Sequence, residues 1–349
     1  MDALDVLQPY GDKNLSLYRK NIKFGEAAGA HDLNGFFALN RHLGDLMPLW
    51  KNGQLAFANA VATPYRDKRS HFDGQDFLEN GGFAKNGSLT SASDGWLNRM
   101  ISLMPNSNIE TAFSVGRQRL LLLEGQAKTS SWSPDSSLDL SDEAKRLLEK
   151  LFKKDQLFAS AAKMAFDLSG KIDGTADGNM NAIRASKAEA LANFAAQRLN
   201  EETRIAAFSI GGFDTHRNQS NNLPRALNEL SSAILTLKKS LGANWDKTTI
   251  LAMSEFGRTV AENGTNGTDH GTGGAMLMAG GAIKGAKIYG KWAGLDESDL
   301  YQRRDLMPTG DIRSYAASAI RDIFSIEKSA IESTIFPSLD MGNVAKIII

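Results

Sequence analysis

Apolar, strand-like runs alternate with helical patterns along much of this chain of 349 residues. Strands that alternate with helices usually form a parallel sheet covered on both faces. The pattern therefore predicts an α/β fold, a doubly wound, mainly parallel sheet with helices on both faces. The expected strands are 6–10, 55–62, 111–115, 205–210, 248–253 and 275–278. The expected helices are 41–51, 72–80, 141–152, 156–168, 181–200, 223–241 and 311–324.

The composition changes at 129–178, where a serine-rich stretch is followed by two helical patterns. We interpret this segment as a helical insertion or cap within a single domain that spans 1–349. The length is compatible with one large α/β domain.

Charge and cysteine content exclude several classes of function. Lys+Arg and Asp+Glu each number 40, so the formal net charge is zero, which argues against a general binder of nucleic acid or anionic membranes. No apolar run is long enough to span a bilayer. Because the chain has no cysteine, a cysteine nucleophile and cysteine metal ligands are excluded. No signal peptide is visible, and the start of the chain looks trimmed.

The first chemical motif is Gly-Gly-Phe-Asp-Thr-His at 211–216, directly after an apolar run. Ligands collect at the carboxyl ends of strands in parallel sheets. Asp214 and His216 lie two residues apart, so in extended backbone both side chains can reach one metal. In the alternative, Asp214 caps a helix and His216 is exposed.

The second motif, Ser-Glu-Phe-Gly-Arg-Thr at 254–259, also follows an apolar run. A carboxylate at the tip of a buried strand is costly unless it is paired or bound to metal, so Glu255 is a candidate metal ligand. Arg258 either pairs with Glu255 or faces a substrate anion, since its planar guanidinium suits phosphate or sulfate.

The third motif is Thr-Asp-His-Gly at 268–271, in a glycine-rich loop before an apolar run. We interpret Asp269 and His270 as candidate metal ligands; the alternative for His270 is an exposed ring in a surface loop. A fourth candidate is Ser70, followed by His71 at the start of a predicted helix. A helix N-terminus favours an alkoxide or a bound anion, whereas the alternative is an ordinary serine N-cap.

Taken together, these motifs resemble the bacterial domain-of-unknown-function 1501 family, a sulfatase-like branch of the alkaline phosphatase superfamily. Segments 33–39, 94–97 and 285–290 support the resemblance, which extends from 2 to roughly 336. It implies an alkaline-phosphatase-like core with one or two divalent metals. Asp2 or Asp5 matches the early metal-binding carboxylate, and Ser70 matches the nucleophile position.

The resemblance also assigns the later residues. Asp214 and His216 match ligands of the first metal, Glu255 stands where the superfamily usually has Asp-His, and His270 matches a late histidine. Two departures matter. Phe256 replaces a histidine ligand, so a second metal is lost or held differently. The chain also lacks both the cysteine and the Cys/Ser-x-Pro-x-Arg pattern of the main sulfatases.

The resulting hypothesis is a metal-dependent hydrolase of phosphate or sulfate esters that acts on a small anionic ester. Ser70 would attack, His71 or His270 would transfer a proton, and Arg258 or Arg69 would stabilise the oxygens. Zinc is favoured by the histidines, whereas calcium, magnesium or manganese fit the carboxylates.

Two alternatives stay open. The first is a catalytically degenerate, exported protein that binds a ligand or partner, and the second is a metal-dependent mutase or isomerase. Twin-arginine export, usual in the family, implies a periplasmic or cell-surface location. The oligomeric state is open.

Overall fold

The structure is a computed structural model that describes residues 1–349 except 67, 86–87, 91, 118–119, 133–186 and 343. The helices predicted at 141–152 and 156–168, most of the predicted insertion at 129–178, and the start of the helix predicted at 181–200 lie outside the described residues. In the described ranges, no helix is both long enough and apolar enough to cross a membrane.

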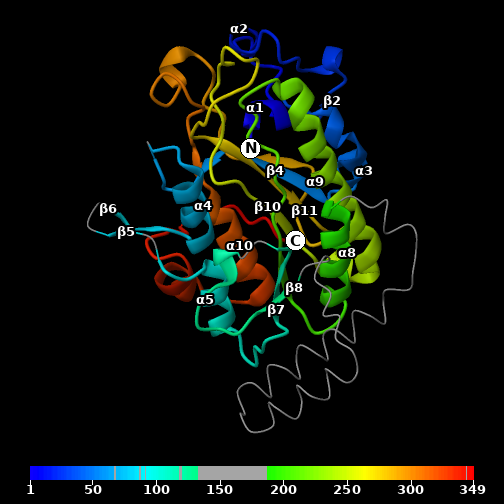
Figure 1. Cartoon of the computed structure of the whole chain (residues 1–349), viewed down its shortest axis with the longest axis vertical. Coiled ribbons are helices and arrows are strands. Elements are labelled where there is room, and N and C mark those ends of the chain that lie inside the picture. The colour runs from blue at the N-terminus through cyan, green and yellow to red at the C-terminus, as the bar shows by residue number, and fades with distance from the viewer. Residues whose placement is uncertain (67, 86–87, 91, 118–119, 133–186, 343) are drawn as a thin grey trace, which may run out of the picture.

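A mixed sheet occupies the centre of the molecule (Figure 1). Its order is β10 (Ile250–Ala252), β11 (Gly274–Ala279), β4 (Leu55–Ala62) and β12 (Lys287–Tyr289), and β13 (Gly310–Asp311) also pairs with β4. β11 is antiparallel to both β10 and β4, whereas β12 and β13 run parallel to β4.

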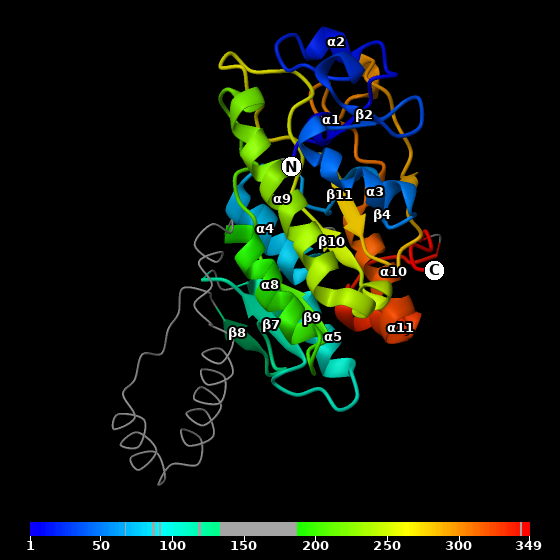
Figure 2. The ribbon, with the colours of Figure 1, turned by 90° about the vertical axis from the view of Figure 1, so that its right-hand side faces the viewer.

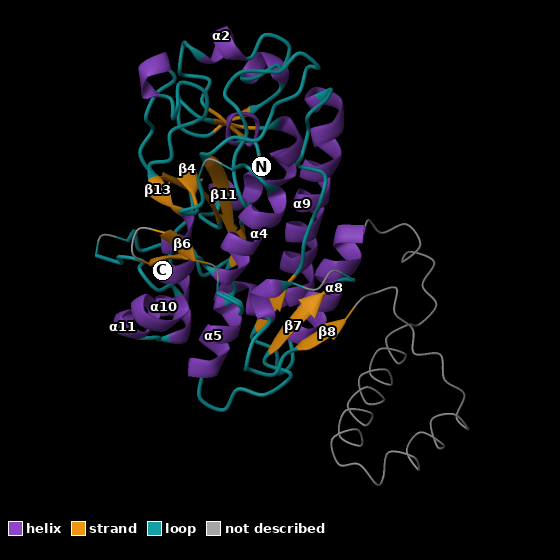
Figure 3. Ribbon diagram, turned by 60° about the vertical axis from the view of Figure 1, so that its left-hand side comes forward, coloured by secondary structure: helices purple, strands orange, loops and turns teal. Residues whose placement is uncertain are grey.

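The prediction of a doubly wound, mainly parallel sheet is therefore wrong. The one all-parallel sheet among the described residues is small and separate. It consists of β8 (Ser130–Trp132), β7 (Ala112–Val115) and β9 (Ile205–Ala207), seen at the lower end of the molecule in Figure 3. The physical reason lies between β10 and β11. A parallel neighbour needs a long crossover, usually a helix. Here a glycine-rich loop returns the chain directly, so β11 pairs antiparallel with β10.

Two smaller antiparallel sheets complete the strand inventory of the described residues. One has the order β1 (Leu7–Gln8), β3 (Ala38–Leu39), β2 (His31–Asp32), and the other is the hairpin of β5 (Phe83–Lys85) and β6 (Ser88–Thr90). Of the strand predicted at 6–10, only Leu7–Gln8 is a strand, because residue 6 belongs to the short helix α1 (Ala3–Val6) and the chain turns after Gln8.

Helices cover the central sheet on both faces (Figures 1 and 2). On one side lie α8 (Lys187–Leu199) and α9 (Gln219–Leu241), and on the other lie α4 (His71–Asn80), α5 (Trp96–Leu103) and α10 (Ile312–Phe324). The remaining described α-helices are short: α2 (Leu15–Tyr18), α3 (Met47–Lys51) and α11 (Lys328–Ala330).

The core explains why β4 is apolar at every position except Asn59. Leu55 and Phe57 pack in the cluster that includes α8 and α9, whereas Ala56 and Ala58 pack with Tyr315 of α10. Successive side chains of a strand point to opposite faces. β4 is therefore buried on both sides, and it carries the chain to the loop that leads into α4.

Candidate metal centre

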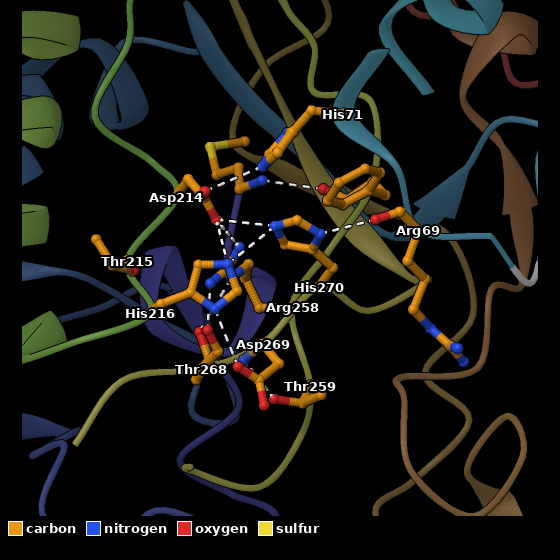
Figure 4. Close-up of polar contacts among 12 residues, drawn as sticks. Arg69, His71, Asp214, Thr215, His216, Arg258, Thr259, Thr268, Asp269 and His270 are labelled. Carbon is orange, nitrogen blue, oxygen red and sulfur yellow. Dashed lines mark hydrogen bonds and ion pairs between the residues drawn. The ribbon is translucent and has the colours of Figure 1, made fainter. Parts of the chain in front are cut away.

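Three chain segments bring a His-Asp-His cluster together (Figure 4). His71 is the first residue of α4, Asp214 lies in the loop after β9, and His270 lies in the loop before β11. Each offers one ligand atom, and the three atoms lie within 4.8 Å of one another. This cluster could hold a metal ion. His216 adjoins it, because its Nε2 lies 3.0 Å from the Nε2 of His270.

Asp214 is the common neighbour of the three imidazoles. Its Oδ1 lies 3.0 Å from His216 Nε2 and 3.1 Å from His270 Nε2, and its Oδ2 lies 3.1 Å from His71 Nε2. Arg258 also donates a hydrogen bond to Oδ1. Burial alone would raise the pKa of Asp214, but the hydrogen bond and charge of Arg258, with the nearby histidines, lower that pKa to about 2. Asp214 is therefore anionic at neutral pH.

Two of the histidines are oriented by acceptors behind them. His270 Nδ1 lies 2.8 Å from the backbone carbonyl oxygen of Arg69, and His216 Nδ1 lies 2.9 Å from Asp269 Oδ1. A carbonyl or an ionised carboxylate can only accept, so each Nδ1 carries a proton, and in the neutral form such a ring presents a lone pair at Nε2. Burial also lowers the pKa of His270, which favours this neutral form.

His71 has the same arrangement. Its Nδ1 lies 2.6 Å from Glu255 Oε1, which again directs the Nε2 lone pair inward. That Nε2 is buried and lies 3.1 Å from Asp214 Oδ2, yet among the described residues it has no partner with hydrogen-bond geometry. A buried polar atom without a partner calls for a physical explanation. A cation between a ring lone pair and a carboxylate would supply one.

The glycine-rich sequences allow the loops of the site to pack backbone against backbone. A Cβ at Gly257 would lie 1.8 Å from the carbonyl oxygen of Gly273, and a Cβ at Gly267 would lie 2.3 Å from the carbonyl carbon of His216. No side chain fits at those distances. The glycines therefore let the two halves of the loop between β10 and β11 pack on each other, and let this loop lie directly on the loop after β9.

Comparison with known families gives one match: residues 51–334 fit the family described as "Protein of unknown function (DUF1501)". The chain belongs to this family. That part of the resemblance is confirmed, and placement in the alkaline phosphatase superfamily stays a prediction. No curated protein and no solved structure matches the chain.

The DUF1501 match includes all four residues around the cluster, but it does not include Asp2. The structure does not bring Asp2 into the cluster. Its carboxylate is 1% exposed, lies 2.7 Å from the guanidinium of Arg19, and caps α1 by accepting from the backbone N–H of Leu4. Asp2, which was predicted to bind a metal, is thus paired with Arg19 instead.

Two predicted metal ligands, Glu255 and Asp269, contact the Nδ1 atoms of the histidines and do not belong to the His-Asp-His cluster. Glu255 accepts from His71, and Asp269 accepts from His216. A hydrogen bond from Asn263 is the main cause that lowers the pKa of Asp269. Carboxylates that hold the far nitrogen of a metal-ligating histidine are a common feature of metal sites, because they fix the tautomer and the ring orientation.

Ser70 lies at the N-cap of α4, where its Oγ accepts from the backbone N–H of Asp73 at 3.5 Å. In the part of the chain that the structure describes, no hydrogen bond joins this hydroxyl to the clustered histidines. Its role as nucleophile stays a prediction.

Arg258 is 2% exposed and turned inward. Its guanidinium contacts Asp214 and the carbonyl oxygen of Thr268, and its Nε donates to Thr268 Oγ1 at 3.1 Å. It therefore pairs with Asp214 rather than with Glu255, and its predicted contact with substrate oxygens stays a prediction.

Phe256 has a position that the sequence did not reveal. Its ring lies 4.9 Å from the ring of His71 and 4.9 Å from that of His270, measured between centroids, and the residue is 6% exposed. A Cβ on Gly74 would come within 3.0 Å of this ring. Phe256 thus forms an apolar wall that supports both imidazoles.

Proposed function

We propose that this chain is a metal-dependent hydrolase of phosphate or sulfate esters. We further propose that His71, His216, His270 and Asp214 bind one divalent cation. The observation that carries the proposal is the orientation of the rings: three Nε2 atoms face one carboxylate, and each Nδ1 is engaged by a protein acceptor. Three nitrogen donors and one oxygen donor favour zinc, since calcium, magnesium and manganese prefer oxygen ligands.

Without a cation, the inward-facing atoms are poorly matched. Two neutral imidazoles whose Nε2 atoms lie 3.0 Å apart present lone pairs to each other and cannot form a hydrogen bond. Either one ring takes up a proton or a cation lies between them. Burial lowers the pKa of His270 and so opposes protonation of that ring, which supports the cation.

Each protein group has a distinct part in the proposed reaction. A divalent cation held by His71, His216, His270 and Asp214 would polarise the ester and would lower the pKa of a water molecule. Asp214 supplies negative charge, and Glu255 and Asp269 keep the rings of His71 and His216 oriented with Nε2 facing Asp214. Phe256 excludes water from one side of the imidazoles, which strengthens the electrostatic interactions there.

We infer that water, rather than Ser70, is the nucleophile. A serine nucleophile is activated by a base or a metal ion that contacts its hydroxyl. In the described residues, the Ser70 hydroxyl instead caps α4. The cation is also the positive group best placed to meet an ester anion. The guanidinium of Arg69 is directed toward Asp305 and Gln302, away from the imidazoles (Figure 4), and Arg258 is paired with Asp214.

The proposal is tested by assaying zinc-loaded protein for turnover of a panel of aryl phosphates and aryl sulfates. We expect turnover of one class and a loss of about 100-fold or more in Asp214→Ala, because the cation loses its carboxylate. Asp45→Ala, which removes an exposed carboxylate elsewhere, is the matched control and should keep full turnover. Equal turnover in Asp214→Ala and the wild type would contradict the proposal.

A second candidate function is binding without catalysis. The ion pair between Arg258 and Asp214 favours it, because an arginine can balance the charge of Asp214 in the absence of metal. This candidate predicts that zinc-loaded protein turns over no ester in the panel.

A further inference from the structure

Gln219 links the two loops that carry three of the four proposed ligands. It is the first residue of α9 and is 0% exposed. Its Oε1 accepts from the hydroxyl of Thr215 at 2.8 Å and from the hydroxyl of Thr268 at 2.7 Å. Thr215 lies between Asp214 and His216, and Thr268 begins the motif that ends beyond His270. One buried amide oxygen therefore joins both loops.

The orientation of this amide is set from its other end. Gln219 Nε2 donates to Asp2 at 2.5 Å and to Asp5 at 2.9 Å. Burial would raise the pKa of Asp2, but the charge and hydrogen bonds of Arg19 hold that pKa below its ordinary value. An ionised Asp2 only accepts, so the amide nitrogen must face it, and the amide oxygen must face the two threonines.

The orientation of the Gln219 amide also sets the hydrogen bonds of Thr268 and Arg258, which lead to Asp214. Because Thr268 donates its hydroxyl proton to Gln219, its oxygen is free to accept from Nε of Arg258 at 3.1 Å. That contact places the guanidinium of Arg258 against Asp214. A buried chain of hydrogen bonds thus connects Asp2 with the carboxylate at the centre of the cluster.

We propose that Gln219 is a positioning residue, which sets the geometry and the metal affinity of the cluster through Thr215 and Thr268. The inference rests on the proposed metal site. A residue that only stabilised the fold would change the free energy of unfolding and leave the affinity of the folded protein for metal unchanged.

The test is a zinc competition titration against a chromophoric chelator, with wild type and paired variants. Thr268→Val keeps the shape of the side chain and removes the hydroxyl, whereas Thr268→Ser keeps the hydroxyl. We expect zinc affinity to fall about 10- to 100-fold in Thr268→Val, as for other groups that orient metal ligands, and to stay near wild type in Thr268→Ser. Asn222→Ala, which removes a side chain that bonds the carbonyl of Arg217 in the first turns of α9, is the control and should leave affinity unchanged.

A double-mutant cycle localises the effect. Gln219→Met removes the amide oxygen at similar volume and should weaken zinc binding by itself. Combined with Thr268→Val it should cause little further loss, because both changes break the same chain of hydrogen bonds. Fully additive losses would contradict the inference.

The outcomes separate the two levels of the proposal. Tight zinc binding by wild type with equal affinity in Thr268→Val overturns the role of Gln219 and leaves the metal site intact. No zinc binding by wild type overturns the metal site and this inference together. If Thr268→Val does not fold, the pair Thr215→Val and Thr215→Ser tests the same amide oxygen through its other donor.

Discussion

At the scale of single residues, the groups behind the imidazoles matter as much as the imidazoles. Arg69 has a positive φ of 52°, and its side chain donates from Nε to the buried Asp305 at 3.1 Å. The carbonyl of the same Arg69 accepts from His270. Asp305 therefore holds the residue that fixes the orientation of His270.

Asp305→Asn should lower zinc affinity by about tenfold, because Arg69 loses its charged partner and His270 loses a fixed acceptor. The variant should also be less stable, since breaking a buried ion pair leaves an uncompensated charge. Zinc competition measured beside thermal unfolding separates the two effects, with Gln302→Ala, an exposed partner of Arg69, as the control. Unchanged zinc affinity in a destabilised variant would limit Asp305 to a structural role.

Gly267→Ala should destabilise the protein by about 2 kcal/mol or more, because its Cβ would meet the backbone of His216 at 2.3 Å. Gly264→Ala is a matched control in the same loop, where a Cβ has no heavy atom within 4 Å. Urea unfolding of both variants gives the comparison. Equal midpoints would show that this loop does not lie against His216.

The sequence nominated some residues that the structure brings together, and it missed the partners of others. Asp214, His216 and His270 could be nominated because each lies beside glycines near the end of an apolar run, and the structure brings them together. The pairing of Asp2 with Arg19 could not be predicted, because it depends on how Arg19 packs against the distant carbonyl groups of Thr259 and Val260. The contacts of Gln219 were hidden for the same reason.

At the scale of elements, the start of α4 decides between two roles for Ser70. Ser70→Ala should reduce stability by about 1 kcal/mol through loss of the N-cap, and Ser70→Asp should restore it, since aspartate caps well. Both variants should retain ester turnover under the proposal of a water nucleophile. Turnover abolished in a stable Ser70→Asp variant would instead identify Ser70 as the nucleophile.

Positions of elements were more predictable than their directions. The strand predicted at 55–62 is β4, and the helix predicted at 72–80 is α4 extended by one residue. An apolar strand is buried whether its neighbouring strand is parallel or antiparallel, so the apolar runs did not predict strand direction. The absence of helical periodicity between 253 and 274 was the available signal for antiparallel pairing. α9 begins four residues earlier than predicted, because its first turn is polar and mostly exposed, with Gln219 alone buried, so apolar periodicity does not mark it.

At the scale of the whole molecule, the histidine pKa values predict how stability depends on pH. Burial lowers the pKa of His270 from 6.5 in the folded protein, so the unfolded chain binds more protons as the pH falls through 6.5. Stability of the metal-free protein should therefore decrease below pH 6.5. Urea unfolding above and below this pH tests the sign, and His270→Gln should reduce the slope. Greater stability on the acidic side would contradict the assignment.

A second acid transition belongs to Asp214. Its pKa is lowered from 3.8 to about 2, so its contribution is present above pH 3.8 and is lost as the pH falls toward 2. As the pH falls, zinc should be released at a higher pH than that at which Asp214 is protonated, because the three imidazoles must be neutral to bind it.

The central claim is that three histidines and Asp214 form one metal centre. Elemental analysis of the purified chain after equilibration with zinc and removal of free metal tests it most directly. The account predicts a single zinc ion per chain in the wild type, and its loss in His216→Ala and in Asp214→Ala but not in Asp45→Ala. Wild-type protein that retains no zinc, or variants that retain as much as the wild type, would contradict it.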